Sequence, residues 1–165
     1  MYCKNDKVSH PGHGACEISG ICEQDFTGTK REYYRLVPFT ESGAVVYVPV
    51  GKADDIGLRA LISETEANQL LDSLSGAEEQ WLSDAMAKQH RYKALFSSNE
   101  KENLYEMMSA MGALVRRKMV KELGSVDKAM LSTIQHKVMS EIALAKGISF
   151  SAAIRQAEEI ITTAG

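Results

Sequence analysis

The hydrophobic pattern of the chain changes its period near residue 60. Before that point, short runs rich in β-formers alternate with turn dipeptides, and the strongest run, residues 44–50, reads AVVYVPV. After it, apolar residues recur at helical spacing as far as residue 161. A strand-only half followed by a helix-only half predicts an α+β protein with two domains, residues 1–58 and residues 59–165.

The N-terminal half carries about five short strands, which are too few for a sandwich but enough to close a small, highly twisted β-barrel. We expect strands over residues 6–10, 15–23, 31–37 and 44–50, separated by turns such as Pro11-Gly12. Pro49 cannot donate to a ladder, so it marks either a sheet edge or the end of a core strand. At an edge, the unpaired backbone groups of this strand can extend the sheet of another protein.

Capping signals divide the second half into helices. Ser63-Glu-Thr-Glu66 and Ser97-Ser-Asn-Glu100 have the capping-box spacing, and Ser125 and Ser149 are expected to cap the last two helices. Glycine is expected to end three of the helices, at Gly76, Gly124 and Gly147. About five helices result, one of them over residues 78–96, and they predict an all-α bundle whose methionine stripe fills the core.

Composition and motifs exclude several classes of protein. The 165-residue chain has no apolar run near the ~20 residues that span a bilayer, and its first residues lack the apolar core of a secretory signal. Its three cysteines are an odd number without CxxC spacing, which favours free thiols in a reducing cytosol. The sequence contains no Ser/His/Asp set, phosphate loop or HExxH motif, so we expect neither an enzyme nor a cofactor.

His10, His13, Cys16 and Cys22 raise the question of a metal site. Their spacing matches no standard zinc pattern, and no second ligand pair follows. Strand alternation would place Cys16 and Cys22 on one face, with the histidines across a turn. We therefore expect no metal, a turn-forming role for this stretch, and thiols that are buried or half-buried.

The net charge of −3 conceals a basic stretch in the helical half. Residues 88–137 carry ten Lys or Arg against five Asp or Glu, while the flanking segments are acidic. Such a local surplus can attract phosphate backbones, although an ordinary solvated helix face has the same composition. Two groups stand out within it. One is His90-Arg-Tyr-Lys93, and the other is Arg116-Arg-Lys118 with Lys121 at the end of its helix, where cations also complement the helix dipole.

Five segments, in this order, resemble the CarD/CdnL family of bacterial transcription regulators: HPGHGACEISGI, REYYRL, VVYVPVGKADDIGLRALIS, RYK and MLSTIQHKVMSEIALAKG. The family shares its N-terminal module with transcription-repair coupling factors. The resemblance implies a Tudor-like β-barrel that docks on the RNA polymerase β subunit, partly by strand addition. It also implies a helical domain that contacts promoter DNA, without base-specific reading, at the upstream edge of the transcription bubble. Together the two domains would stabilise the open complex in the cytoplasm.

The resemblance also implies roles for particular residues. Tyr47 and Gln24 match barrel positions where some members use arginine to meet polymerase. Lys93 matches a phosphate-contacting lysine, and Arg116 or Arg117, with Lys128, match basic residues of the later helices. The candidate polymerase contacts are Gln24, Phe26, Val46, Tyr47 and Pro49. The candidate DNA contacts are Lys88, Arg91, Lys93, Arg116, Arg117, Lys121 and Lys128.

Two alternatives remain at the level of the sequence. Some relatives carry a wedge tryptophan at the position of Lys88, so either Trp81, two helical turns earlier, takes that role or this protein lacks the wedge. In the second case Trp81 is an anchor in a core or interface. The whole chain could also be a protein-interaction adaptor that does not bind DNA, and salt-dependent retention on DNA separates that hypothesis from the first.

Overall fold

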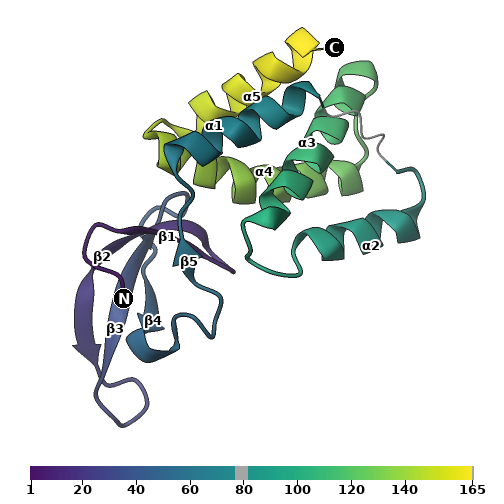
Figure 1. Ribbon diagram of the computed structural model, residues 1–165. Coiled ribbons are helices and arrows are strands. Elements are labelled where there is room, and N and C mark those ends of the chain that lie inside the picture. Colours follow the sequence, from purple (N-terminus) through teal and green to yellow (C-terminus); the bar gives the residue numbers. More distant parts are fainter. Residues whose placement is uncertain (77–81, 165) are drawn as a thin grey trace. The chain divides into compact units, whose positions relative to one another are not determined.

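The computed structural model describes residues 1–76 and 82–164, and it divides the chain into two compact units, Met1–Leu61 and Ile62–Gly165. The first unit is built on an antiparallel sheet and the second on helices, so the α+β prediction is confirmed (Figure 1). Within the described part of the chain, no helix is both long enough and apolar enough to cross a bilayer.

The sheet has five strands in the order β4-β3-β2-β1-β5. The strands are β1 (Lys7–His10), β2 (Gly14–Gln24), β3 (Arg31–Pro38), β4 (Val46–Pro49) and β5 (Arg59–Ala60). Among the described residues no pairing joins β4 to β5, so the sheet is open and the predicted closed barrel is not confirmed. Pro49 is the last residue of β4, and β4 is an edge strand. Proline is tolerated at a strand end and in an edge strand, so Pro49 meets both conditions.

The inner face of the sheet forms the core of the first unit. Three cross-strand pairs lie on this face: Val8 with Cys16, Ile18 with Leu36, and Tyr34 with Val48. All six side chains are buried and pack together with Ala53 and Leu58 from the loop before β5. Pairs of this kind stabilise a sheet because directly opposite side chains lie in contact.

A bulge in β2 changes which residues face outward. The register with β3 shifts between Ile18 and Gly20, which leaves Ser19 as the extra residue. Cys16 lies in the inner core, whereas Cys22 is opposite Tyr33, whose neighbour Tyr34 faces inward. The prediction that Cys16 and Cys22 share a face is therefore wrong, because one inserted residue reverses the alternation that it assumed.

The histidines of the β1–β2 turn hold the backbone. His10 Nδ1 accepts the N–H groups of Gly12 and His13, at 3.0 and 3.1 Å. The His13 ring lies 3.2 Å from the Glu41 carboxylate. The predicted turn-forming role is confirmed, and the thiols of Cys16 and Cys22 are buried and half-buried, respectively, as expected.

The described residues of the second unit form five helices. They are α1 (Glu64–Asp72), α2 (Ala85–Leu95), α3 (Glu102–Val120), α4 (Ser125–Lys146) and α5 (Phe150–Ala164). A short 3-10 turn, Ser73–Ser75, follows α1. Methionines of α3 contribute to the bundle core beside leucines, as the stripe predicted: the buried ones are Met107, Met108 and Met111.

Three of the predicted helix ends are confirmed. Ser63 and Glu66 form a reciprocal capping box at the start of α1. This backbone hydrogen bond from Ser63, helped by the ammonium of Lys101, lowers the pKa of the Glu66 carboxyl. Ser149 accepts a hydrogen bond from the Ala152 N–H at the start of α5. Gly147 ends α4 with a φ of 70°, which glycine adopts without strain.

Two other predicted helix starts are wrong. The Ser97–Glu100 segment is not a capping box, because α3 begins at Glu102 and the Asn103 side-chain amide donates to Ser98 instead. The residue that precedes α4 as its N-cap is Gly124 rather than Ser125. The helix α2 begins at Ala85, where the Asp84 carboxylate accepts the Ala87 N–H, and residues 82–84 are not helical. The predicted start of this helix at residue 78 lies outside the described residues.

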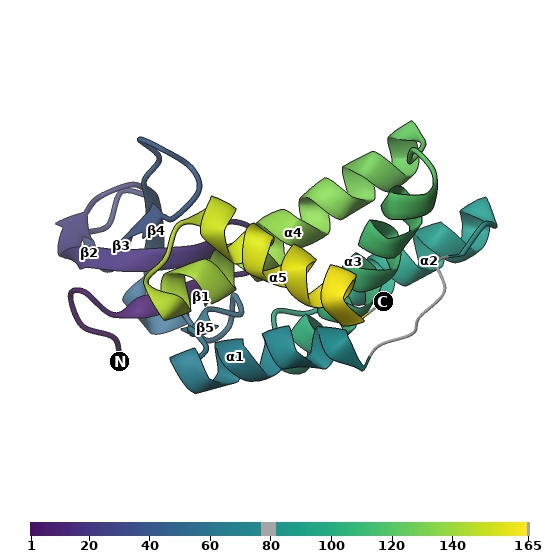
Figure 2. The ribbon, with the colours of Figure 1, turned by 90° about the horizontal axis from the view of Figure 1, so that it is seen from above.

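The helix α2 is the least buried of the first four helices. It contributes one fully buried residue, Leu95, and the half-buried rings of Tyr92 and the following Phe96 pack against the core. The ribbon shows α2 at the margin of the bundle, beside α3 and α4 (Figures 1 and 2). The helices α1, α3, α4 and α5 contribute most of the bundle core. This core holds α3 and α4 in place and so fixes the exposed ends of these two helices.

A buried carboxylate connects α4 to the start of α1. Glu141 is 1% exposed, and its Oε2 accepts the backbone N–H of Ile62 at 3.1 Å. Ile62 directly precedes the Ser63 cap, so this bond fixes the entry of the chain into the bundle. A buried N–H without an acceptor costs free energy comparable to a lost hydrogen bond.

Replacing Glu141 should test this contact. Glu141→Ala removes the acceptor and is expected to lower the free energy of unfolding by about 1–3 kcal/mol. Glu141→Gln keeps a side-chain oxygen in the same position and should cost less. Urea unfolding of the full chain, followed by circular dichroism at helical wavelengths, measures both. Equal losses for the two variants would contradict the assigned role.

Candidate functional site

Three aromatic rings meet on the outer face of the sheet. Phe26 lies with its ring centroid 5.1 Å from that of Tyr33 and 5.3 Å from that of Tyr47, and the two tyrosines are 6.5 Å apart. We call these three residues the aromatic cluster. Phe26 is 57% exposed and Tyr47 37% exposed, whereas Tyr33 beneath them is only 6% exposed. Exposed aromatic side chains of this kind are enriched where proteins bind one another.

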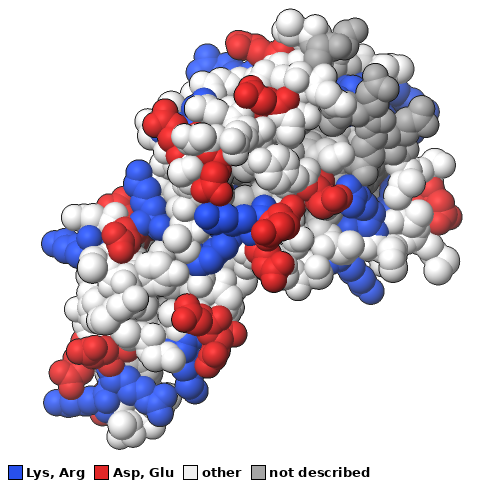
Figure 3. Space-filling view, viewed as in Figure 1, with Lys and Arg blue, Asp and Glu red and all other residues white. Residues whose placement is uncertain are grey.

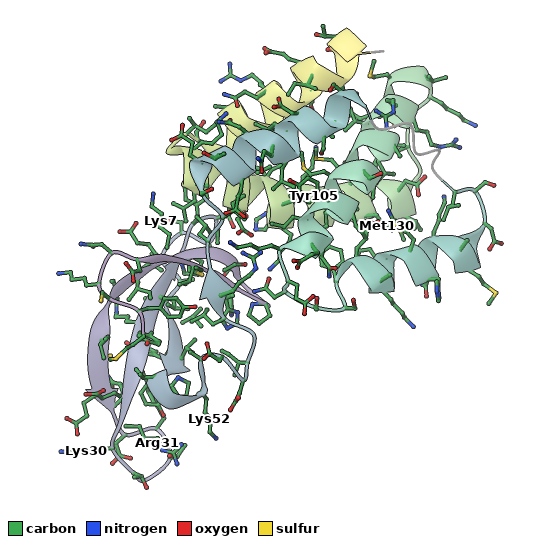
Figure 4. All side chains as sticks on the ribbon, viewed as in Figure 1. Lys7, Lys30, Arg31, Lys52, Tyr105 and Met130 are labelled. Atoms are coloured by element: carbon green, nitrogen blue, oxygen red, sulfur yellow. The ribbon has the colours of Figure 1, made fainter. Side chains whose placement is uncertain are left out.

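The sheet register and one turn bring the cluster together. Tyr47 lies opposite Arg35 in the β3–β4 ladder, two residues along from Tyr33, so the tyrosines are diagonal neighbours. The turn after β2 carries Phe26 over them, and Gly28 in that turn has a φ of 86°. Lys30 lies at the other end of this turn, and Arg31 begins β3 (Figure 4).

The remaining predicted polymerase contacts divide between the two faces. Pro49 is opposite Tyr33 and therefore adjoins the aromatic cluster. Gln24, the last residue of β2, is half-buried, and its amide lies 3.8 Å from the Cys22 sulfur. Val46 is opposite Leu36 and packs against the inner core. The structure thus groups Phe26, Tyr47 and Pro49, and it places Val46 on the other side of the sheet.

Three of the predicted DNA-contacting cations form ion pairs within the helical unit. Lys88 Nζ is 2.9 Å from Asp127, and the two side chains are only 17% and 7% exposed. Arg91 pairs with Glu106 at 2.8 Å. Lys128 pairs with Glu122 at 3.1 Å, but these side chains are 58% and 86% exposed. An exposed pair contributes roughly 0–1 kcal/mol and opens readily, whereas breaking a buried pair leaves a charge without compensation.

The other predicted cations carry no ion pair to any residue that the structure describes. Lys93, Arg117 and Lys121 are exposed. The Arg116 guanidinium lies back along α3, where it would approach a Cβ on Gly112 to within 3.2 Å. On the face in view, basic and acidic side chains alternate over the helices (Figure 3). On this face, therefore, positive and negative charges are mixed.

Two grooves run along opposite sides of α4. The α2–α4 groove, of about 460 Å³, is lined mainly by apolar and neutral residues and includes Met130, labelled in Figure 4: Gln89, Tyr92, Lys93, Val126, Ala129, Met130 and Thr133. The α3–α4 groove, of about 570 Å³, is more polar: Lys118, Glu122, Leu123, Lys128, Leu131, Ser132 and Gln135. Neither groove was predicted from the sequence.

The sequence does contain one signal for the α3–α4 groove. Lys128, Leu131, Ser132 and Gln135 are spaced by three, one and three residues, which places them on one face of a helix. Their polar members could have been recognised as a single surface. Trp81, the possible wedge, lies outside the residues that the structure describes.

Comparisons with known proteins place both units in one family. Residues 2–62 match the family model of the CarD-like/TRCF RID domain, and residues 69–161 match that of the CarD C-terminal domain. A Bacillus subtilis (strain 168) protein named "Putative transcription factor YdeB" is 25% identical over 149 residues, which cover 90% of this chain and 95% of that protein. The sheet unit joined to the helical unit is thus the two-domain arrangement of a transcription regulator.

The chain belongs to the CarD-like family. Its N-terminal unit is a domain of the RID type, which interacts with RNA polymerase, and its C-terminal unit is the helical domain of the same family. This is a family of transcription factors and not one of enzymes.

The two lysines of α2 should behave differently when their charge is removed. Lys88→Met leaves the Asp127 carboxylate buried and unpaired, so it is expected to lower the free energy of unfolding by about 1–3 kcal/mol. Lys93→Met, on the exposed side of the same helix, should change it by less than about 0.5 kcal/mol. Thermal or urea unfolding of the two variants gives the comparison, and equal stabilities would show that the Lys88–Asp127 pair does not hold α2.

Proposed function

We propose that this chain is a transcription regulator that connects RNA polymerase to promoter DNA in the cytoplasm. The sheet unit docks on the polymerase β subunit, and the helical unit touches DNA without reading its sequence. Holding both partners at once stabilises the open complex, since each contact adds to the lifetime of the other. The observation that carries this proposal is the exposed aromatic cluster beside an open sheet edge, in a unit of the RID type.

The polymerase contact rests on two features of the same edge. Phe26 and Tyr47 present large apolar surface that water solvates poorly, and such anchors dominate binding energy at interfaces. Next to them β4 has a partner strand on one side only, so a strand of the β subunit can add to the other side. The interface proposed here is aromatic rather than arginine-based, because Tyr47 and Gln24 stand at the positions discussed above.

The DNA contact rests on cations that can leave their present surroundings. Lys93, Arg117 and Lys121 are exposed, and Lys128 and its partner Glu122 are both largely exposed. Such side chains can exchange water or a carboxylate for a backbone phosphate and release counterions in doing so. We assign Lys88 a structural role instead, because its ammonium is held by a buried carboxylate.

The aromatic cluster gives the first test of this function. Tyr47→Glu in the full chain should weaken binding to the isolated β subunit by about 2 kcal/mol or more, which is roughly 30-fold, because it removes an anchor and adds a charge to an apolar contact. Ile56→Glu is the matched control: Ile56 is 39% exposed in the loop before β5 and receives the same charge.

Surface plasmon resonance with immobilised β subunit measures both variants. Near-ultraviolet circular dichroism confirms that the sheet unit remains folded. If Tyr47→Glu binds like the unchanged protein, the aromatic cluster is not the polymerase surface. Val46→Asp is unsuitable for this purpose, because Val46 packs against the inner core and its replacement would unfold the unit.

The end of α3 gives the second test. Arg117→Glu combined with Lys121→Glu should abolish retention on duplex DNA at moderate salt and reduce the slope of log affinity against log salt by about two, since two phosphate contacts are lost. Lys30→Glu with Lys52→Glu makes the same change of charge in the sheet unit and should retain binding. Fluorescence anisotropy across a salt series provides the slopes. An unchanged protein that shows no salt-dependent binding would favour the adaptor hypothesis instead.

A further inference from the structure

The α3–α4 groove combines the chemistry of an anion site. Two ammonium groups, those of Lys118 and Lys128, line it from different helices. The Ser132 hydroxyl and the Gln135 side-chain amide add neutral hydrogen-bond donors on the α4 side. The apolar part of the lining comes from the buried residues Leu123 and Leu131. An anion with several oxygens can therefore be bound from two sides while resting on an apolar surface.

One carboxylate of the protein itself already lines this groove. Glu122 is the one acidic residue in its lining, and its carboxylate is 3.1 Å from Lys128 Nζ. Both side chains of this pair are mostly exposed, so water and salt weaken the attraction, and the carboxylate can move away. The Lys88–Asp127 pair, by contrast, is nearly enclosed, so an external anion reaches it far less easily. Exposure thus distinguishes a cation that an external ligand can reach from one that it cannot.

We propose that the α3–α4 groove binds a backbone phosphate of duplex DNA through Lys118, Lys128, Ser132 and Gln135, and that Glu122 competes for the same position. The inference rests on the proposed function, since it takes the ligand to be the DNA that the helical unit contacts. It adds three residues, Lys118, Ser132 and Gln135, to the DNA surface. It also assigns Glu122 an opposing role, so that removing its charge strengthens binding.

The opposite groove argues for this choice. The α2–α4 groove has one cation in its lining, Lys93, and is otherwise composed of apolar or neutral side chains. Both linings contain neutral donors, so the difference lies in the cations: a phosphate in the α2–α4 groove would meet one ammonium group, whereas in the α3–α4 groove it meets two once the Glu122 carboxylate has moved away. Bonds to ionised donors are about twice as strong as bonds between neutral groups, so the α3–α4 groove is the better phosphate site.

The test uses the full chain and a short fluorescein-labelled duplex of mixed sequence, with anisotropy measured across a salt series. Lys118→Gln should weaken binding roughly fivefold to tenfold at ~0.1 M salt and reduce the salt slope by about one. Ser132→Ala with Gln135→Ala should also weaken binding several-fold but leave the slope unchanged, because no charge is removed. Glu122→Gln should bind several-fold more tightly than the unchanged protein.

Matched controls separate a local effect from a change of net charge. Glu102→Gln makes the same change as Glu122→Gln at the other end of α3, about 30 Å away along the helix and beyond the ~10 Å over which salt leaves charges coupled. It should leave affinity unchanged. Lys30→Gln, in the sheet unit, is the control for Lys118→Gln. Circular dichroism verifies that every variant keeps its helix content.

The outcomes distinguish this inference from the function on which it rests. If the unchanged protein does not bind the duplex at low salt, the proposed DNA contact itself fails. If the unchanged protein binds and Arg117→Glu with Lys121→Glu abolishes binding, but Lys118→Gln and the Ser132–Gln135 pair of substitutions have no effect, only the groove is wrong. An equal gain from Glu122→Gln and Glu102→Gln would overturn the role given to Glu122.

Discussion

One extra residue in β2 determines which side chains of the sheet unit reach its outer face. Because Ser19 is the extra residue of a bulge, the alternation of inward and outward side chains along β2 is reversed after Ile18. In the second half of the strand, Cys22 therefore lies opposite Tyr33. The Arg35 guanidinium donates to the Ser19 hydroxyl at 2.8 Å, and that hydroxyl donates to the Arg35 carbonyl at 3.1 Å. The bulge is therefore tied to the neighbouring strand. Without it, the outer face under Phe26 would have different neighbours.

In the helical unit, two lysine–carboxylate ion pairs of similar length differ in how deeply they are buried. Lys88–Asp127 and Lys128–Glu122 are both lysine–carboxylate contacts near 3 Å, and both involve the first turns of α4. One is enclosed and joins α2 to the bundle, while the other lies in solvent at the rim of a groove. A count of basic residues treats the two lysines as equal. Their environments give one a structural task and leave the other available to a ligand.

Local patterns predicted much of the fold, and tertiary packing decided the rest. The order of strands and helices, the Ser63 cap, the αL end at Gly147 and the methionine core followed from periodicity and capping chemistry. The bulge at Ser19 did not, because small residues in a strand give no signal for an inserted position. The start of α3 was misjudged because Asn103 competes for Ser98, a contact that depends on the path of the chain before the helix.

For the candidate surfaces, the sequence indicated candidate residues but not the environments in which they lie. Phe26, Tyr47 and Pro49 do lie together, because their spacing and the ladder register agree. Val46, which was also named, packs against the inner core, because adjacent strand residues point to opposite faces. The sequence did not single out Lys118, Ser132 and Gln135, because the groove that they line forms only where α3 and α4 meet.

The shallow burial of α2 has a consequence for the dynamics of the helical unit. Leu95 is its one fully buried residue, and the nearly enclosed Lys88–Asp127 ion pair also holds it, so α2 should separate from the bundle at a lower free-energy cost than unfolding of the core of α3 and α4. Its amide protons should therefore exchange with solvent through a local opening and not through global unfolding. When α2 opens, Lys88, Arg91 and Lys93 move as one segment, so an equilibrium between docked and detached helix controls three cations together.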